Sequence, residues 1–129
     1  MLDVDALARQ LRLFGWEPAL QDEKTFRVVR DSDEGELPVF VRLTDNWLVA
    51  SVVPFLATRG DNSFELARWL LRQNRDMYQT KFAYDEDGDV VLTVELPTES
   101  LDPGEIRTAL NALVDHAVAH RRTLRQAAR

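Results

Sequence analysis

The residue types best suited to chemistry in this sequence are two histidines, His116 and His120, which stand four residues apart. On a helix this spacing can bring both imidazole rings to one metal ion, and Asp115 is a neighbouring carboxylate. The glutamate that a zinc-protease motif places between its histidines is absent, and His120 falls within an apolar seam. We therefore interpret the pair as core or interface histidines and expect no functional metal.

A second candidate is the acidic run at residues 85–89, Asp-Glu-Asp-Gly-Asp, which alternates acids as a calcium-binding loop does. A calcium loop places glycine at its sixth position and a bidentate glutamate at its twelfth. Here the glycine, Gly88, is fourth in the run. Because an Asp-Gly pair between two alternating apolar segments is typical of a hairpin, we predict a solvated turn.

Arginines gather in two places, a pattern that also occurs in sites for phosphate or RNA. Arg68, Arg72 and Arg75 share one face of a predicted helix, together with the acids Glu65 and Asp76. No aromatic residue is interleaved there to stack on bases, and the net charge of −6 opposes non-specific binding to nucleic acid. We favour a solvated face and keep a binder of a phosphate-containing ligand or RNA as the alternative function. Three more arginines follow near the C-terminus: Arg121, Arg122 and Arg125.

The residues that nucleophilic or acid–base catalysis requires are missing or badly placed. The chain has no cysteine, no Gly-x-Ser-x-Gly motif and only two histidines, both on one predicted helix. None of its five glycines opens a helix after a strand, as a phosphate-binding loop needs. Its paired carboxylates fall in turns, where water keeps their pKa values ordinary. We expect neither an enzyme nor a cofactor.

Hydrophobic periodicity predicts the element order α-β-β-β-α-β-β-α, which is an antiparallel sheet with packed helices in the α+β class. The second helix is predicted to start with Asn62 and Glu65 as a capping box, and the third with Asp102 and Glu105. The predicted helices are residues 3–14, 62–77 and the segment from 102 onward; the predicted strands are residues 25–30, 37–43, 47–53, 80–84 and 90–96.

Asn74 is a polar residue in the middle of the apolar arc of the second helix. A buried amide needs hydrogen-bond partners. We predict that its side chain ties the helix to the backbone entering the next strand, and a ligand contact is the other interpretation.

The alternation of the third predicted strand places Trp47, Val49 and Val53 on one face, which we assign to the core. The other face of the sheet would then be more apolar than a hydrated face should be. We expect either a helix of this chain or a second subunit to cover it. This second face would hold Val29, Phe40, Leu48, Ala50, Val52 and Val91.

Length and composition agree with a single domain over residues 1–129. The N-terminal segment lacks the basic and apolar regions of a signal peptide, and no apolar run is long enough for a membrane span. With no cysteine and a pI near 4.9, we expect a cytoplasmic protein with no membrane partner.

One stretch of the sequence resembles the YbjN family of bacterial sensory transduction regulators, whose fold is shared with type III secretion chaperones of the CesT kind. The similar segments are Leu70-Leu71-Arg72-Gln73-Asn74-Arg75, Lys81-Phe82-Ala83-Tyr84-Asp85, Asp87-Gly88-Asp89-Val90-Val91-Leu92 and Glu95-Leu96-Pro97. The resemblance implies a bacterial homodimer without catalytic residues that binds an extended segment of an unidentified protein partner, in a chaperone-like or regulatory role.

These expectations lead to two sets of candidate residues. Binding of an extended segment commonly combines strand addition at a sheet edge with side chains that enter apolar pockets. The predicted partner-binding residues are Phe14, Trp16, Phe40 and Leu48, and the predicted dimer-interface residues are Leu66, Trp69 and Val52.

Overall fold

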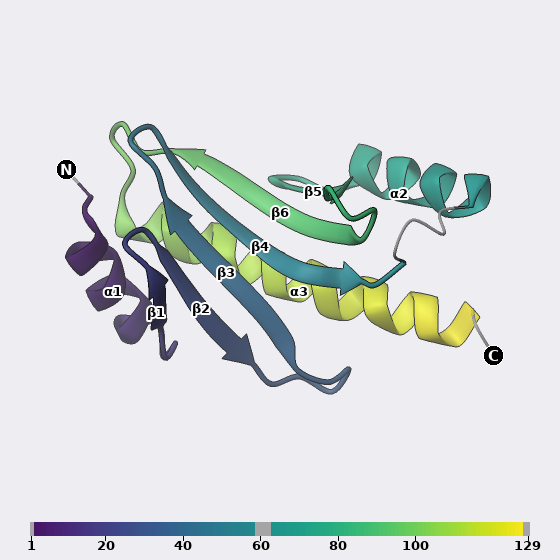
Figure 1. Cartoon of the computed structure of the whole chain (residues 1–129), viewed down its shortest axis with the longest axis horizontal. Coiled ribbons are helices and arrows are strands. Elements are labelled where there is room, and N and C mark those ends of the chain that lie inside the picture. Colours follow the sequence, from purple (N-terminus) through teal and green to yellow (C-terminus); the bar gives the residue numbers. More distant parts are fainter. Residues whose placement is uncertain (1, 59–62, 128–129) are drawn as a thin grey trace.

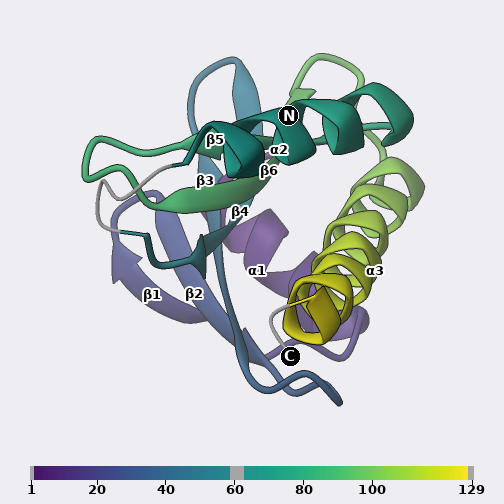
Figure 2. The same cartoon turned by 90° about the vertical axis from the view of Figure 1, so that its right-hand side faces the viewer.

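The protein is described by a computed structural model over residues 2–58 and 63–127. Helices cover one face of a six-stranded antiparallel sheet with the strand order β1-β2-β3-β4-β6-β5 (Figures 1 and 2). This confirms the predicted α+β class. The elements are α1 (Val4–Leu13), β1 (Ala19–Asp22), β2 (Thr25–Arg30), β3 (Leu37–Leu43), β4 (Trp47–Leu56), α2 (Phe64–Asp76), β5 (Thr80–Tyr84), β6 (Val90–Pro97) and α3 (Pro103–Ala127).

Strand β1 is an element that the sequence did not predict. It has only four residues, and all four side chains are exposed, so it carries no apolar alternation to recognise. It pairs antiparallel with β2, with Leu20 opposite Phe26, and it forms one edge of the sheet. The hairpin therefore exists because β2 offers it a backbone partner.

The first and third helices, α1 and α3, begin at polar capping residues that the sequence specifies. Asp3 accepts a hydrogen bond from the amide nitrogen of Ala6 at 2.8 Å, which starts α1. The predicted box at α3 is confirmed: the amide nitrogen of Glu105 donates to Asp102 at 2.7 Å, and the amide nitrogen of Asp102 donates back to Glu105 at 3.3 Å. Helix α2 begins at Ser63, which caps Leu66; the predicted cap at Asn62 lies outside the described residues.

Helices α1 and α3 bury a continuous apolar core against one face of the sheet. The predicted apolar stripe of α1 is confirmed for Leu7, Ala8 and Leu11, which are buried. Helix α3 contacts β4, β5 and β6 and passes behind the sheet in Figure 1. Its predicted seam is buried at Ile106, Leu110, Leu113 and Ala117.

The face assignment predicted for the third strand of the sequence, now β4, is wrong. Leu48, Ala50 and Val52 point into the core, with Leu48 2% exposed and Val52 0% exposed. The register explains this, because Ala50 pairs with Val41 and Val52 with Val39, and paired residues share a face. The side chains on both faces of β4 are apolar. The alternation of side chains along the strand therefore could not tell which face the helices cover.

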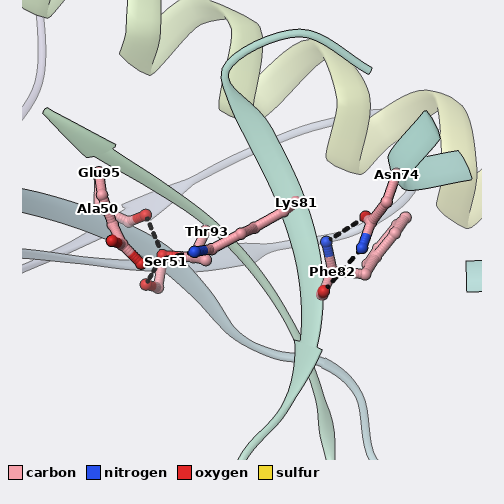
Figure 3. Close-up of polar contacts among 7 residues, drawn as sticks. All are labelled: Ala50, Ser51, Asn74, Lys81, Phe82, Thr93 and Glu95. Carbon is pink, nitrogen blue, oxygen red and sulfur yellow. Dashed lines mark hydrogen bonds and ion pairs between the residues drawn. The ribbon is translucent and has the colours of Figure 1, made fainter. Parts of the chain in front are cut away.

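Asn74 ties α2 to the exposed edge of β5. Its Nδ2 donates to the carbonyl oxygen of Phe82 at 3.1 Å, and its Oδ1 accepts from the amide nitrogen of Phe82 at 2.6 Å (Figure 3). The predicted bond to the backbone of the following strand is therefore confirmed. Since β5 is the second edge of the sheet, the amide occupies a donor and an acceptor that a neighbouring strand would otherwise use.

We expect Asn74→Ala to lower the free energy of unfolding by about 1–3 kcal/mol, because both backbone groups of Phe82 lose their partner. Urea denaturation followed by circular dichroism measures the change, and the Phe82 amide should exchange its hydrogen faster. Gln73→Ala, at the adjacent position, is the control and should cost less than about 0.5 kcal/mol. Equal losses in the two variants would contradict this role of Asn74.

Candidate protein-binding surfaces

A groove runs between α1 and the β1–β2 hairpin; we call it the α1 groove. It lies beside β1, which pairs only with β2 within the described part of the chain. Leu20 of β1 lines it and is 59% exposed. The groove is lined by Val4, Asp5, Ala8, Arg9, Arg12, Pro18, Leu20 and Phe26.

The two aromatic residues predicted to form a pocket at the end of α1 lie elsewhere than expected. Trp16 is buried in the core, and the guanidinium of Arg30 lies 5.0 Å from its ring centroid. Phe14 is half-buried, with the guanidinium of Arg107 5.8 Å from its ring. Neither residue lines the α1 groove.

The other two predicted partner-binding residues lie on opposite faces of the sheet. Phe40 is half-buried on the face away from the helices, as expected, and Leu48 lies in the core. A core position offers no surface to a partner. Phe40 therefore belongs to a different surface from the α1 groove.

Helix α2 carries an exposed apolar stripe, which we define by Phe64, Leu71 and Tyr78. Their side chains are 75%, 69% and 86% exposed. Phe64 and Leu71 are seven residues apart, a spacing that keeps both on one side of the helix, and Tyr78 follows shortly after the helix ends. The sequence predicts a broad apolar arc on this helix that includes Leu71 and Tyr78 but not Phe64, and only packing reveals which part of the arc remains uncovered.

The predicted dimer-interface residues are less accessible than this α2 stripe. Leu66 and Trp69 are half-buried, and Val52 is fully buried. Trp69 packs inward, with ring centroids 5.8 Å from Phe82 and 5.5 Å from His120. Trp69 therefore makes its ring contacts within the protomer.

The two histidines belong to the same aromatic cluster, which joins α2, β5 and α3. Their rings are stacked, with centroids 6.1 Å apart and planes 12° apart, and His120 also contacts Phe82 at 5.4 Å. Burial, and secondarily the charge of His116, lower the pKa of His120. Within residues 2–58 and 63–127, no three histidine, aspartate or glutamate side chains are grouped to hold a metal ion.

The charged segments singled out in the sequence have structural partners. Asp85 accepts hydrogen bonds from the amide nitrogens of Asp87 and Asp89, both at 2.9 Å, as expected for a hairpin turn. Arg121 donates to the carbonyl oxygens of Glu36 and Pro54. These arginine contacts hold the end of α3 against the strands.

The cations on α2 are solvated, as predicted. Arg68 and Arg72 are exposed, and Arg75 forms an ion pair with Asp76 at 3.0 Å, which lowers the pKa of Asp76. Separately, no helix among the described residues is long and apolar enough to cross a membrane.

Comparison with solved structures defines the class of fold. The chain superposes on a chain of the ExsC–ExsE complex with a TM-score of 0.66 and 23% sequence identity, covering 94% of this chain and 96% of that one. It superposes on a chain of the complex between the Yersinia pestis type III secretion chaperone SycH and a fragment of YscM2 with a TM-score of 0.57 and 21% identity, covering 88% of this chain and 94% of that one. It also superposes on a chain of the ExoU–SpcU complex from the type III secretion system of Pseudomonas aeruginosa, with a TM-score of 0.62 and 14% identity, covering 88% of this chain and 93% of that one. The fold is therefore that of type III secretion chaperones.

Residues 3–126 match the YbjN family, described as "Putative bacterial sensory transduction regulator". The chain belongs to this family, as the sequence indicated. No curated protein matches it.

The lowered pKa of His120 predicts a pH dependence of stability. As pH falls through about 6.5, the unfolded chain takes up a proton before the folded one, so stability should decline until the lowered pKa is reached. Thermal melts between pH 8 and pH 5 measure this, and His120→Gln should flatten the profile relative to the wild type. His116→Gln should keep most of the slope, because burial is the larger cause. Identical profiles for wild type and His120→Gln would contradict the assignment.

Proposed function

We propose that this protein is a non-enzymatic, homodimeric protein-binding module of the cytoplasm, chaperone-like or regulatory, that binds an extended segment of a partner protein. The observation that carries the proposal is the α1 groove beside the sheet edge β1. The fold supports it, since the three similar structures are complexes of two proteins, and one of them holds the type III secretion chaperone SycH with a fragment of YscM2.

The two edges of the sheet differ in a way that favours strand addition at β1. At β5, Asn74 occupies the outward backbone groups of Phe82, and α2 packs alongside. At β1, the strand is short and exposed, and the apolar side chains of Leu20 and Phe26 lie in the adjoining groove. A segment paired with β1 could hydrogen-bond through its backbone and place alternate side chains in the α1 groove.

The α2 stripe supports self-association as the means of dimerisation. Phe64, Leu71 and Tyr78 are three large apolar side chains that are mostly exposed on or just after one helix, and exposed apolar groups of this kind often mark a contact surface. A two-fold axis would bring the same stripe of two copies together, since such an interface is self-complementary. We therefore propose the α2 stripe as the dimer surface. Of the residues predicted for the interface, Leu66 and Trp69 are half-buried and Val52 is buried in the protomer, so none of them is part of the stripe.

Light scattering at micromolar concentration should give about twice 14.8 kDa for the wild-type chain. Leu71→Asp should reduce this to the monomer mass without unfolding the protein, because its side chain is mainly exposed in the protomer. The matched control is Leu13→Asp on α1, where the leucine is 76% exposed and outside the stripe. A wild-type monomer, or a dimer in both variants, would rule out the α2 stripe.

The binding mode is tested with a partner captured from the native cytoplasm and identified by mass spectrometry. Its shortest binding segment, titrated by calorimetry, should keep most of its affinity in high salt, because the contact buries apolar surface. Leu20→Asp in the α1 groove should weaken binding about tenfold or more, and Leu13→Asp should leave it unchanged.

The alternative function gives the opposite pattern. If affinity falls steeply with salt and Arg72→Ala abolishes it while Leu20→Asp does not, the protein binds an anion or RNA through α2. That result would replace the present proposal.

A further inference from the structure

Helix α3 is held to the protomer in one way along its first part and in another way at its end. The first part is anchored by side chains that are at most 2% exposed: Ile106, Ala109, Leu110, Leu113 and Ala117. None of the side chains of residues 121–124 is buried, although Leu124 packs partly against the core. We call residues 121–127, the last turns of the helix, the α3 strap; Figure 2 shows it beside the β2–β3 turn. Apolar burial therefore contributes less to holding the strap than to holding the rest of α3.

The guanidinium of Arg121 bridges two strands and covers an aromatic ring. Its terminal nitrogens donate to the carbonyl oxygens of Glu36 at 3.1 Å and of Pro54 at 3.3 Å. Its central carbon lies 5.7 Å from the ring centroid of Phe55, which is only 3% exposed in this arrangement. Phe55 in turn packs on Phe82 of the aromatic cluster, with ring centroids 5.0 Å apart. Arg121 is thus the part of the strap that shields one end of this cluster.

The turn between β2 and β3 presents a carboxylate to the strap. The backbones of Ser32 and Gly35 exchange two hydrogen bonds, both of 3.1 Å, and the hydroxyl of Ser32 accepts from the amide nitrogen of Glu34 at 3.2 Å. Gly35 has a φ of 94°, which favours glycine at this position. The side chain of Glu34 is 11% exposed, and its Oε1 accepts from Nε of Arg122 at 3.0 Å. The ordered turn therefore holds Glu34 in place for Arg122.

The contacts of the strap are of a kind that breaks easily. The side chain of Arg122 is half exposed, and salt screens an ion pair that has a partner in water. Hydrogen bonds from a guanidinium to carbonyl oxygens at the surface exchange with water at little net cost. Segments with few buried apolar contacts open locally, at a lower free energy than the whole domain. The strap meets this condition, whereas the first part of α3 does not.

From these contacts we infer that the α3 strap is a releasable lid, which leaves the protomer as one unit when the ion pair between Glu34 and Arg122 breaks and which uncovers Phe55. High ionic strength favours the open state, because both arginines then exchange protein partners for water and counterions. The inference concerns neither the α1 groove nor the α2 stripe, and it does not depend on the function proposed for them.

Hydrogen exchange of the full chain, followed by NMR, tests the release. The amides of residues 121–127 should exchange at one common opening free energy, and at least about tenfold faster than those of residues 109–113 in the anchored part. Raising the salt from about 50 mM to about 500 mM should speed exchange in the strap severalfold and leave residues 109–113 unchanged. The ring signals of Phe55 should shift with salt in step with the strap amides, whereas those of Phe40, on the opposite face of the sheet, should not.

Variants of the ion pair identify what holds the strap closed. Glu34→Gln and Arg122→Gln should each speed exchange of the strap amides about fivefold, and the double variant should fall short of the product of the two effects, because both remove the same contact. The matched control is Glu95→Gln, which breaks the ion pair of Glu95 with Lys81 on β5 and should leave the strap unchanged. Circular dichroism should show the same fold in all four variants.

Three results would overturn the inference. Exchange that rises steadily from residue 121 to residue 127 and ignores Glu34→Gln would be ordinary fraying of a helix end. Protection of the strap equal to that of residues 109–113 would mean that the strap is fixed. Release of the strap with no change in the ring signals of Phe55 would mean that it covers nothing. None of these results bears on the Leu71→Asp or Leu20→Asp tests, so this inference and the proposed function fail separately.

Discussion

Every surface of this protein depends on one packing constraint, which is that the helices cover a single face of the six-stranded sheet. The buried face supplies the core, where Leu7 and Leu11 of α1 and Leu113 of α3 meet the inward side chains of the strands. The opposite face has to meet water or a partner, although β-branched and aromatic residues that suit a pleated strand occur on both sides of it. Its mixed apolar and charged composition follows from this.

The same one-sided packing makes the two sheet edges unequal. Helix α2 lies against the β5 edge. The hydrogen bonds of Asn74 to the backbone of Phe82 hold it there, together with the ring contacts among Trp69, Phe82 and His120. At the other edge, the short strand β1 has α1 as a neighbour across a groove. Because the β5 edge is occupied in this way, β1 is the edge whose backbone is open for pairing with a further strand.

The apolar arc of helix α2 is broad because one part of it packs against the rest of the protomer and another part is exposed. One side, with Leu70, Trp69 and Asn74, fixes the helix to β5 and α3; the other exposes Phe64 and Leu71. On the inward side, the ring of Trp69 packs directly on the ring of His120. The cationic residues between these sides, such as Arg72, remain solvated and complete the helix surface.

The sequence by itself determined the elements and much of their chemistry. Local signals act over three or four residues, so Asp102 with Glu105 fixed the start of α3, and the alternation of apolar residues fixed the strands other than β1. The tie between Asn74 and the next strand was also predictable, because a buried amide requires partners close to it in the chain. The YbjN family resemblance rested on these same packing and turn residues.

Only the tertiary structure decided which side of each element is covered. Leu48 and Val52 were assigned to the wrong face because both faces of β4 are apolar. The strand register places them on the same buried face as their partners Leu43 and Val39. Strand β1 formed because β2 offered it a partner, and Trp16 became a core residue because the chain turns back after α1. Hydrophobic periodicity and secondary-structure propensity are properties of one segment and its two sides. Burial depends on which other segments pack against it, and that information lies outside the segment.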